Sequence, residues 1–269
     1  MVDSAPRHVV VTGASSGIGR ALALAYAAPG VTLGLLGRDA ERLEASGQAC
    51  RRRGAQVRTG SIDVRDAEAL KAWLDAFDAD HPIDLLIANA GASSTLAHAG
   101  EWEDLARTTH IMDTNFYGAL HAALPVIERM RARGQGQIAL VASLVALRGM
   151  SIAPAYSASK AALKAWGDAV RPLLQRRGIA VSVVLPGFVK TAMSDSYPAD
   201  KPLMWSAEQA ADYIRRKVAA RRAEIAFPFL LQLGARLQTL LPTAWADRQS
   251  FSQSFNSPDG PSSGGDAKH

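Results

Sequence analysis

The feature that most constrains the fold of this chain is a regular alternation of short apolar runs and helical patterns. The runs are mostly apolar and rich in Val, Ile, Leu and Ala, which is typical of buried strands. We expect strands at 8–11, 31–36, 57–62, 83–88, 137–141 and 180–185, with helices between them at 18–28, 43–53, 66–77, 108–133 and 156–177. Such an alternation predicts a doubly wound α/β fold, with one parallel sheet and helices on both faces.

We expect a single domain over residues 1–249, because no linker or internal repeat interrupts the pattern. Ser206 is placed to cap a helix to about residue 220, and 223–227 reads as a short edge strand. The segment 188–205 mixes Met, Tyr, Trp and Pro, and we interpret it as a substrate loop. The segment 228–241 predicts an amphipathic helix, and the tail 250–269, rich in Ser, Gly, Asp and Pro, is expected to be disordered.

A glycine-rich loop, Thr12-Gly13-Ala14-Ser15-Ser16-Gly17-Ile18-Gly19, joins the first strand to the first helix. Its glycines permit a tight turn and let the backbone approach a pyrophosphate. The amides and dipole at the N-terminus of the following helix favour such an anion. A strand before the loop and a helix after it predict a Rossmann-type nucleotide site.

Tyr156 and Lys160 lie four residues apart in a predicted helix and therefore share one of its faces. A phenol with a pKa near ~10 is a poor acid or base at neutral pH, but a fixed cation nearby lowers that pKa by stabilising the phenolate. The pair therefore suggests a tyrosine that shuttles a proton. The same spacing also arises by chance on many helices, so other residues must support this interpretation.

That support comes from motifs whose order resembles the short-chain dehydrogenase/reductase family in its typical single-domain form, over residues 7–227. The motifs are the glycine-rich loop, Asp63-Val64, Asn89-Ala90-Gly91, Asn115, Ser143, the Tyr156 to Lys160 pair and Pro186-Gly187. Where the family usually has two asparagines before Ala-Gly, this chain has Ala88 in the first place. The retained Asn89-Ala90-Gly91 keeps the backbone approach that this motif provides.

The resemblance implies a catalytic role for four residues. Tyr156 would exchange the substrate proton, and Lys160 would hold the nicotinamide ribose and lower the pKa of the tyrosine. Ser143 would hydrogen-bond the substrate oxygen, and Asn115 would hold a water that connects Lys160 to solvent. Hydride would reach the carbonyl carbon while Tyr156 protonates its oxygen, and the reverse direction would oxidise an alcohol. Read without the resemblance, Ser143 is an ordinary polar residue at a strand end and Asn115 a helix-interior residue bonded to nearby backbone.

The family also implies a cofactor site, with Asp63 and Val64 at the adenine and Thr191 at the nicotinamide carboxamide. The expected cofactor-binding residues are Gly13, Ser15, Ser16, Gly17, Ile18, Gly19, Arg38, Asp63, Val64, Asn89, Ala90, Gly91, Tyr156, Lys160, Pro186, Gly187 and Thr191. No metal site is implied.

The cofactor is expected to be NADP, with NAD also usable, because of the residues after the second predicted strand. An acid there bonds the ribose hydroxyls of NAD, whereas an arginine accommodates the 2′-phosphate of NADP. By resemblance the acid would stand at position 37, where this chain has Gly37, and Arg38 follows with a charge for the phosphate. Asp39 could reach the ribose instead, although its position before Ala40 reads better as a helix N-cap.

Composition sets the remaining expectations. The 269 residues are 48% hydrophobic and 20% charged, without a signal peptide or an apolar run long enough for a bilayer, which favours a cytoplasmic location. The single Cys50 cannot form an intramolecular disulfide, and we assign it no role. The net charge of +5 comes without aromatic interleaving or a nucleic-acid motif, so we expect no nucleic-acid partner.

The leading interpretation is an NADP-dependent oxidoreductase acting on a carbonyl or secondary alcohol, and two alternatives stay open. A nucleotide-sugar epimerase or dehydratase shares the Tyr-Lys pair, but the segment after Pro186 leaves little room for a sugar-binding domain. A non-catalytic NAD(P)-sensing protein would tend to lose one catalytic group, and this chain keeps all four. Met193, Tyr197, Met204 and Trp205 suggest an apolar substrate, although such a set is as often simple packing.

Partners are expected at the long helices and at the C-terminal helix. The helices from Thr108 and from Tyr156 favour a homodimer or homotetramer, as in many relatives. In 228–241 the stripe Leu230, Leu233, Leu237 and Leu241 lies at helical spacing. This stripe would pack on the core, at the edge of the substrate site, on a partner or, with upstream arginines facing lipid, on a membrane.

Overall fold

A single seven-stranded sheet forms the centre of the protein in a computed structural model that describes residues 5–98, 100–195, 197 and 201–255. All neighbouring strands are parallel, in the order β3-β2-β1-β4-β5-β6-β7. The strands are β1 (His8–Thr12), β2 (Thr32–Gly37), β3 (Gln56–Ser61), β4 (Leu85–Ala88), β5 (Gly136–Val141), β6 (Ile179–Pro186) and β7 (Glu224–Phe227). The predicted doubly wound α/β fold is confirmed, including the short strand at the edge.

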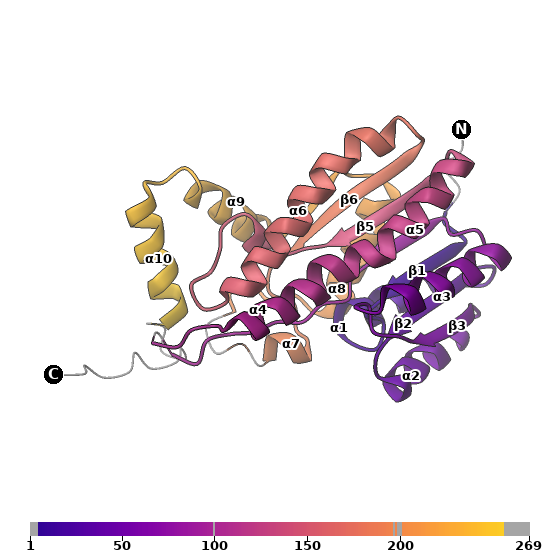
Figure 1. Ribbon diagram of the computed structural model, residues 1–269, viewed down its shortest axis with the longest axis horizontal. Helices are drawn as coiled ribbons and strands as arrows, with labels where there is room; N and C mark the ends of the chain where they lie inside the picture. The colour runs from indigo at the N-terminus through magenta and orange to yellow at the C-terminus, as the bar shows by residue number, and fades with distance from the viewer. Residues whose placement is uncertain (1–4, 99, 196, 198–200, 256–269) are drawn as a thin grey trace.

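Helices cover both faces of this sheet (Figure 1). One face packs against α3 (Ala67–Asp80), α5 (Gly118–Arg133) and α6 (Pro154–Gln175), around Leu74, Phe77 and Leu163. The other face packs against α1 (Gly17–Tyr26), α2 (Ala40–Arg51) and α8 (Ala207–Ala219), around Leu22 and Ile214. Both faces of the strands are therefore buried, which explains why their sequences are nearly all apolar rather than alternating.

The helix predicted over 108–133 is divided into three segments in the structure. It begins earlier, as α4 (Leu105–Met112), and passes through a π-helix, η1 (Asp113–Tyr117), before α5. Asn115 lies in this π-helix, and its side chain bonds to groups outside the helix. π-helical insertions often mark functional sites. The predicted stop at Gly134 is observed, with a left-handed φ of 70°.

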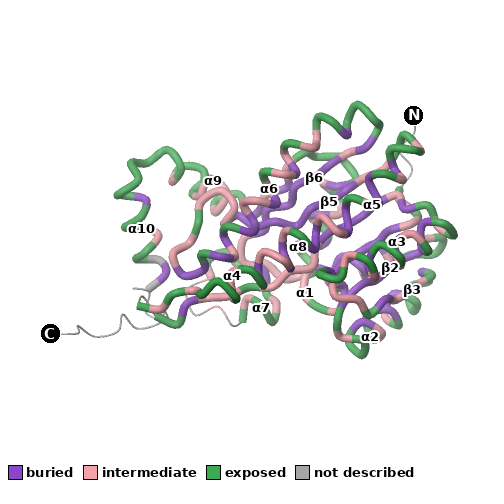
Figure 2. Tube along the Cα trace, in the orientation of Figure 1, coloured by how far each residue is buried: buried purple, intermediate pink, exposed green. Residues whose placement is uncertain are grey.

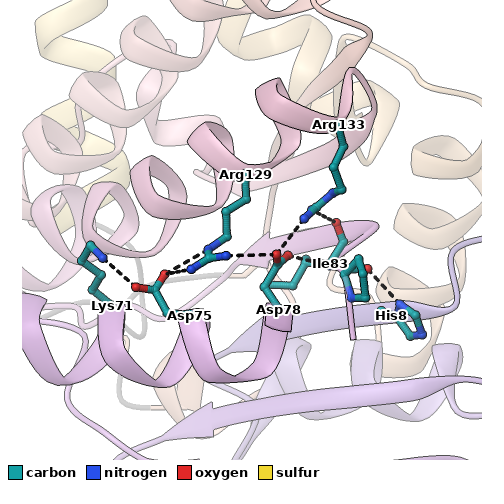
Figure 3. Close-up of polar contacts among 8 residues, drawn as sticks. His8, Lys71, Asp75, Asp78, Ile83, Arg129 and Arg133 are labelled. Carbon is teal, nitrogen blue, oxygen red and sulfur yellow. Dashed lines mark hydrogen bonds and ion pairs between the residues drawn. The ribbon is translucent and has the colours of Figure 1, made fainter. Parts of the chain in front are cut away.

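An ionic network joins α3 to α5 on the outer side of the sheet (Figure 3). Asp75 accepts from Lys71 at 2.6 Å and from Arg129 Nε at 3.0 Å. The buried carboxylate of Asp78 accepts from Arg133 at 2.7 Å and from the Ile83 amide at 2.8 Å. The network therefore fixes α5 against α3 and against the start of β4.

The chain ends in two helices, α9 (Phe229–Gln238) and α10 (Thr243–Phe255), at one end of the molecule, and α10 stands apart from the sheet (Figure 1). α9 is shorter than the predicted helix over 228–241. α10 differs from the expected disordered tail, since residues 250–255 are helical and Ser250 bonds to Ser151. Residues 256–269 lie outside the described residues. Much of α9 and α10 is exposed (Figure 2), and no helix in the described ranges is long and apolar enough to cross a bilayer.

Candidate active site

A cavity of about 890 Å³ opens at the carboxyl ends of the strands. Its walls come from the loops that follow β1, β4, β5 and β6, from the start of α6 and from α9. Of the residues predicted to bind cofactor or substrate, those that line the cavity are Gly13, Ser16, Gly17, Ile18, Asn89, Ala90, Gly91, Ser143, Tyr156, Lys160, Pro186, Gly187 and Thr191. Loops far apart in the sequence therefore meet at one edge of the sheet.

The glycine-rich loop packs directly against the Asn89-Ala90-Gly91 turn. Thr12 Oγ1 accepts from the amides of Asn89 and Ala90, both at 3.0 Å. A methyl group on Gly13 would lie 2.8 Å from the Ala90 Cα, and one on Gly19 would lie 2.2 Å from the Gly13 carbonyl oxygen. Neither position can accept a side chain without a backbone shift, so the two turns form one rigid floor.

The N-terminus of α1 faces the cavity from this floor. Ser16 occupies its N-cap, and within the described chain its side chain makes no capping bond. Gly17, with a left-handed φ of 53°, and Ile18 follow and line the cavity. The first-turn amides and the helix dipole are therefore available to an anion, as a dinucleotide pyrophosphate requires. The residues present fit that group.

Ser143, Tyr156 and Lys160 converge opposite this floor. Ser143 follows β5 and lines the cavity beside Tyr156, and its hydroxyl donates to the Pro186 carbonyl oxygen at 3.4 Å. The Lys160 ammonium, 5.8 Å from the centre of the tyrosine ring, donates to the Val141 carbonyl oxygen at 2.9 Å. The i, i+4 spacing on α6 places both side chains in the cavity, as the sequence predicts.

Burial shifts the pKa values of the pair in opposite directions. It lowers the pKa of Lys160 from 10.5 to about 8. Burial also raises the pKa of Tyr156, and the neighbouring Ser143 hydroxyl opposes that rise. Both shifts have the same cause, since a low-dielectric site disfavours the charged form of each group. A site with such perturbed groups in a cleft is a candidate for proton transfer.

Asn115 lies behind Lys160 and connects three parts of the chain. Its amide nitrogen donates to the Ala92 carbonyl oxygen and to Ser159 Oγ, both at 2.9 Å, and its oxygen accepts from the Ala92 amide at 2.7 Å. A methyl group on Gly91 would lie 3.2 Å from this oxygen and 3.4 Å from Lys160 Nζ. Asn115 thus adjoins the lysine, although it does not line the cavity itself.

The residues expected at the adenosine end lie outside the cavity, toward β2 and β3. Arg38 follows β2 and is largely exposed, with Nη1 4.0 Å from Asp63 Oδ2. Asp63 also pairs with Arg65 at 2.7 Å, and hydrogen bonds from Arg65 lower the pKa of this carboxyl. Asp39 is the N-cap of α2 and accepts from the Arg42 amide at 2.9 Å, as the sequence favours.

Three further predicted residues have structural contacts that the sequence leaves open. The Val64 side chain is buried in the core against Gly118, and its carbonyl oxygen bonds to His121. Gly19 packs inside the floor, and Ser15 lies beneath Gly37, whose added methyl would be 3.3 Å from Ser15 Oγ. Only the backbone of Val64 can therefore face a ligand.

The wall that the sequence left as one of several alternatives is formed by α9 and the residues just after it. Leu230, Leu231 and Leu237 of α9 line the cavity, as does Leu241 after the helix. The leucine stripe is visible in the sequence, but nothing local tells which surface it covers. The four apolar residues of the expected substrate loop divide: Met193 and Tyr197 line the cavity, whereas Met204 does not and Trp205 stacks on Phe227.

Polar groups also stand at the outer part of this wall. Arg148 and Gln249 line the cavity, and Arg148 is paired with Asp247 of α10. Across the described residues no cluster of His, Cys, Asp and Glu could hold a metal ion. The floor therefore suits a nucleotide, whereas the α9 wall suits an apolar group.

Comparison with known proteins gives concordant matches. A sequence profile described as short chain dehydrogenase matches residues 7–202. An uncharacterized oxidoreductase from Myxococcus xanthus is 34% identical over 249 residues, 92% of this chain and 97% of that protein. The 11-beta-hydroxysteroid dehydrogenase-like 2 of Arabidopsis thaliana is 32% identical, over 82% of this chain and 73% of that protein. The structure of a short-chain dehydrogenase from Sphingobium yanoikuyae in complex with NADPH is similar with a TM-score of 0.76, 26% identity, and coverage of 91% and 95%.

Proposed function

The chain belongs to the short-chain dehydrogenase family and is an NAD(P)-dependent oxidoreductase, and from this premise we propose that it interconverts a carbonyl and a secondary alcohol with NADP. The observation that carries the proposal is the convergence of Ser143, Tyr156 and Lys160 on one cavity whose floor fits a dinucleotide. The bound nicotinamide supplies or accepts the hydride. The residues of the chain supply orientation and the proton.

Tyr156 is the proposed acid in carbonyl reduction and the base in alcohol oxidation. Burial keeps its phenol protonated, which suits a donor to the oxygen on which negative charge develops. Ser143, which lines the same cavity, presents its hydroxyl to that oxygen. The Lys160 ammonium stabilises the phenolate left after transfer, because the two groups share a buried face of α6.

Asn115 has a supporting role in this proposal. It lies beside Lys160 and is held by the Ala92 backbone and by Ser159. From this place it holds the water that connects Lys160 to solvent, so that the proton used by Tyr156 can be replaced. The π-helix supports this role because it turns the amide out of the regular helical pattern.

The preference for NADP rests on Gly37, Arg38 and Asp39. The guanidinium of Arg38 is exposed beside the site and suits a charge-assisted contact with a 2′-phosphate. Asp39 is occupied as the cap of α2, and Gly37 brings no repelling charge. The NADPH bound in the Sphingobium relative supports the same preference. We propose that the other cofactor-binding residues predicted from the sequence, from Gly13 in the glycine-rich loop to Thr191, also contact the cofactor.

The substrate is proposed to be apolar. Its chamber lies between Ser143 and α9, with Met150, Met193, Leu231 and Leu237 in its walls. Binding of an apolar substrate here is favoured by roughly 25 cal/mol of free energy for each Å² of apolar surface that the substrate and the protein remove from water. An apolar carbonyl compound therefore gains more from this wall than a sugar does, which disfavours the epimerase alternative.

We propose that the protein is cytoplasmic and forms a homodimer or homotetramer. We also propose that its exposed C-terminal helices contact a membrane peripherally. Leu124 on α5 and Leu173 on α6 are 48% and 67% exposed, which supports pairing of these helices between copies. Phe229, Leu240 and Trp245 are 69–79% exposed at the C-terminal helices. This apolar group supports the membrane contact, because monomers seldom leave such patches uncovered.

A panel of octan-2-one, cyclohexanone, acetophenone and the corresponding secondary alcohols, followed by NADPH absorbance, tests the proposal. We expect at least one carbonyl compound to be reduced, with one NADPH oxidised for each molecule of carbonyl compound consumed. Tight NADPH binding without turnover of any compound would favour a sensing protein. Conversion of a nucleotide sugar, assayed in parallel, without net consumption of NADPH would favour an epimerase or dehydratase.

A further inference from the structure

The helix that carries Tyr156 and Lys160 begins without a cap of its own. Its N-cap is Ala153, which has no side-chain oxygen, and Pro154 and Ala155 follow in the first turn. Other helices here are capped locally: Asp39, Asp66 and Ser206 each accept from an amide three residues on. The first turn of α6 therefore needs an acceptor from elsewhere.

Glu103 supplies that acceptor from 52 residues away. It precedes α4, its side chain is only 4% exposed, and its Oε2 accepts from the Ala155 amide at 2.6 Å. Its other oxygen, Oε1, accepts from Ser94 Oγ, in the loop that follows the Asn89-Ala90-Gly91 turn. The carboxylate thus bonds both to the turn that carries Tyr156 and to the loop that leaves the cofactor floor.

A second set of contacts holds Glu103 in place. Arg107 lies one turn further on, with Nε 3.9 Å from Glu103 Oε1, and donates to the Thr95 carbonyl oxygen at 2.5 Å and to Glu101 at 2.8 Å. The Leu96 amide donates to the Ile152 carbonyl oxygen at 2.8 Å, just before α6. The loop and the start of the helix therefore form one unit.

A buried carboxylate is costly to desolvate unless its charge is compensated. Here the positive end of the α6 dipole and the charge of Arg107 provide the compensation. Ala155 immediately precedes Tyr156, so its amide orients the peptide from which the phenol extends. A small displacement of a reacting group lowers the rate steeply, because proton transfer depends on distance and angle.

We propose that Glu103 is a positioning residue for the reaction, holding the first turn of α6 so that the Tyr156 phenol faces Ser143 and the substrate oxygen. This role rests on the proposed function of Tyr156. A positioning role differs from a purely structural role in one measurable respect. Because Glu103 acts through the phenol, removing its carboxylate should lower kcat only while the phenol of Tyr156 is present.

A double-mutant cycle tests the proposal with the full chain and the panel carbonyl that is reduced fastest. Glu103→Ala should lower kcat about tenfold or more, with NADPH affinity and KM within about twofold of the wild type. In the Tyr156→Phe background the same substitution should lower kcat less than about twofold, because residues that act as a unit are not additive. Equal losses in both backgrounds would overturn the proposal.

Two further variants serve as controls. Glu103→Gln keeps an oxygen that can accept from the Ala155 amide, and we expect it to recover most of the lost kcat. Glu44→Ala removes a carboxylate of α2 that is paired with Arg51, outside the contacts that hold Glu103, and should leave kcat unchanged. If Glu103→Ala does not fold, Glu103→Asp replaces it, because the shorter carboxylate keeps the charge without reaching the amide.

Amide hydrogen exchange of the segment 152–160 provides a readout without turnover. Glu103→Ala should speed exchange there, Glu103→Gln should restore protection, and Glu44→Ala should have no effect. Unchanged exchange in Glu103→Ala would overturn the positioning role. This measurement decides the matter even if no carbonyl in the panel is reduced, a result that would refute only the proposed function.

Discussion

The Lys160 ammonium donates to the carbonyl oxygen of Val141, at the end of β5, at 2.9 Å. This bond joins the helix that carries Tyr156 to the strand that leads into Ser143. It holds the lysine beneath the tyrosine ring in a buried setting, and its consequences can be measured in the protein without cofactor.

Unfolding free energy should rise with pH in the cofactor-free protein because of Lys160. Burial lowers its pKa from 10.5 in the unfolded chain to about 8 in the folded one, so above about pH 8 the unfolded chain binds more protons. The contribution of Lys160 to the unfolding free energy therefore increases as pH rises above about 8, and it is lost again as pH falls through about 8. Between pH 7 and 9.5, Lys160→Met should remove on the order of 2 kcal/mol of this rise.

Urea unfolding at several pH values measures this difference. Desolvation raises the pKa values of Tyr26, Tyr156 and Tyr197, so their contribution to stability is lost only at higher pH, and these tyrosines are common to both proteins. Parallel stability curves for wild type and Lys160→Met would show that the ammonium is not buried as described.

Tyr156→Phe should abolish most turnover while leaving the cofactor site intact. The phenyl ring fills the same space but cannot donate a proton, so kcat should fall by roughly two decades or more. NADPH affinity, measured by fluorescence titration, should change little. Turnover close to the wild-type rate would remove Tyr156 from the mechanism.

Arg38→Ala should weaken NADPH binding about tenfold or more and NADH binding hardly at all, because only NADPH carries the phosphate that the guanidinium would bind. Titration of both cofactors checks this. Arg42→Ala is a matched control, because its guanidinium is paired with Asp39, the cap of α2. A similar loss for both cofactors in Arg38→Ala would assign that residue a structural role.

Asp78→Ala should destabilise the fold without altering the site. The buried Asp78 carboxylate bonds to Arg133 and to the Ile83 amide, and Arg129 lies at 3.6 Å (Figure 3). Its loss leaves the Ile83 amide unpaired, and we expect about 2 kcal/mol less unfolding free energy. Asp80→Ala, with an exposed carboxylate 3.5 Å from Arg58, is the control and should cost little. Equal costs would contradict the importance of the network.

Replacing Phe229 and Leu240 by Gln should abolish the proposed membrane contact. Both side chains are largely exposed, and neither lines the cavity, so turnover should be unchanged. Flotation with vesicles rich in phosphatidylglycerol should recover the wild type but not the double variant. Light scattering of both proteins shows whether these residues instead hold two copies together, which a halved mass in the variant would indicate.

The succession of strands and helices along the chain, the glycine-rich loop and the Tyr156 to Lys160 pair are determined by local sequence. Apolar periodicity is set by whether each residue faces the core, and helical spacing alone brings Tyr156 and Lys160 to one face. Caps such as Asp39, Asp66 and Ser206 act within three residues and can be read in the same way. These features needed no knowledge of what lies opposite them.

Contacts between distant segments were decided only by the tertiary structure. Glu103 resembles many surface glutamates in the sequence, and its bond to Ala155 exists because the loop before α4 folds back on α6. The leucine stripe of α9 is visible in sequence, but its place at the cavity depends on the direction in which the chain leaves β7. Local patterns record whether a side chain is buried, whereas its partner depends on how whole elements pack.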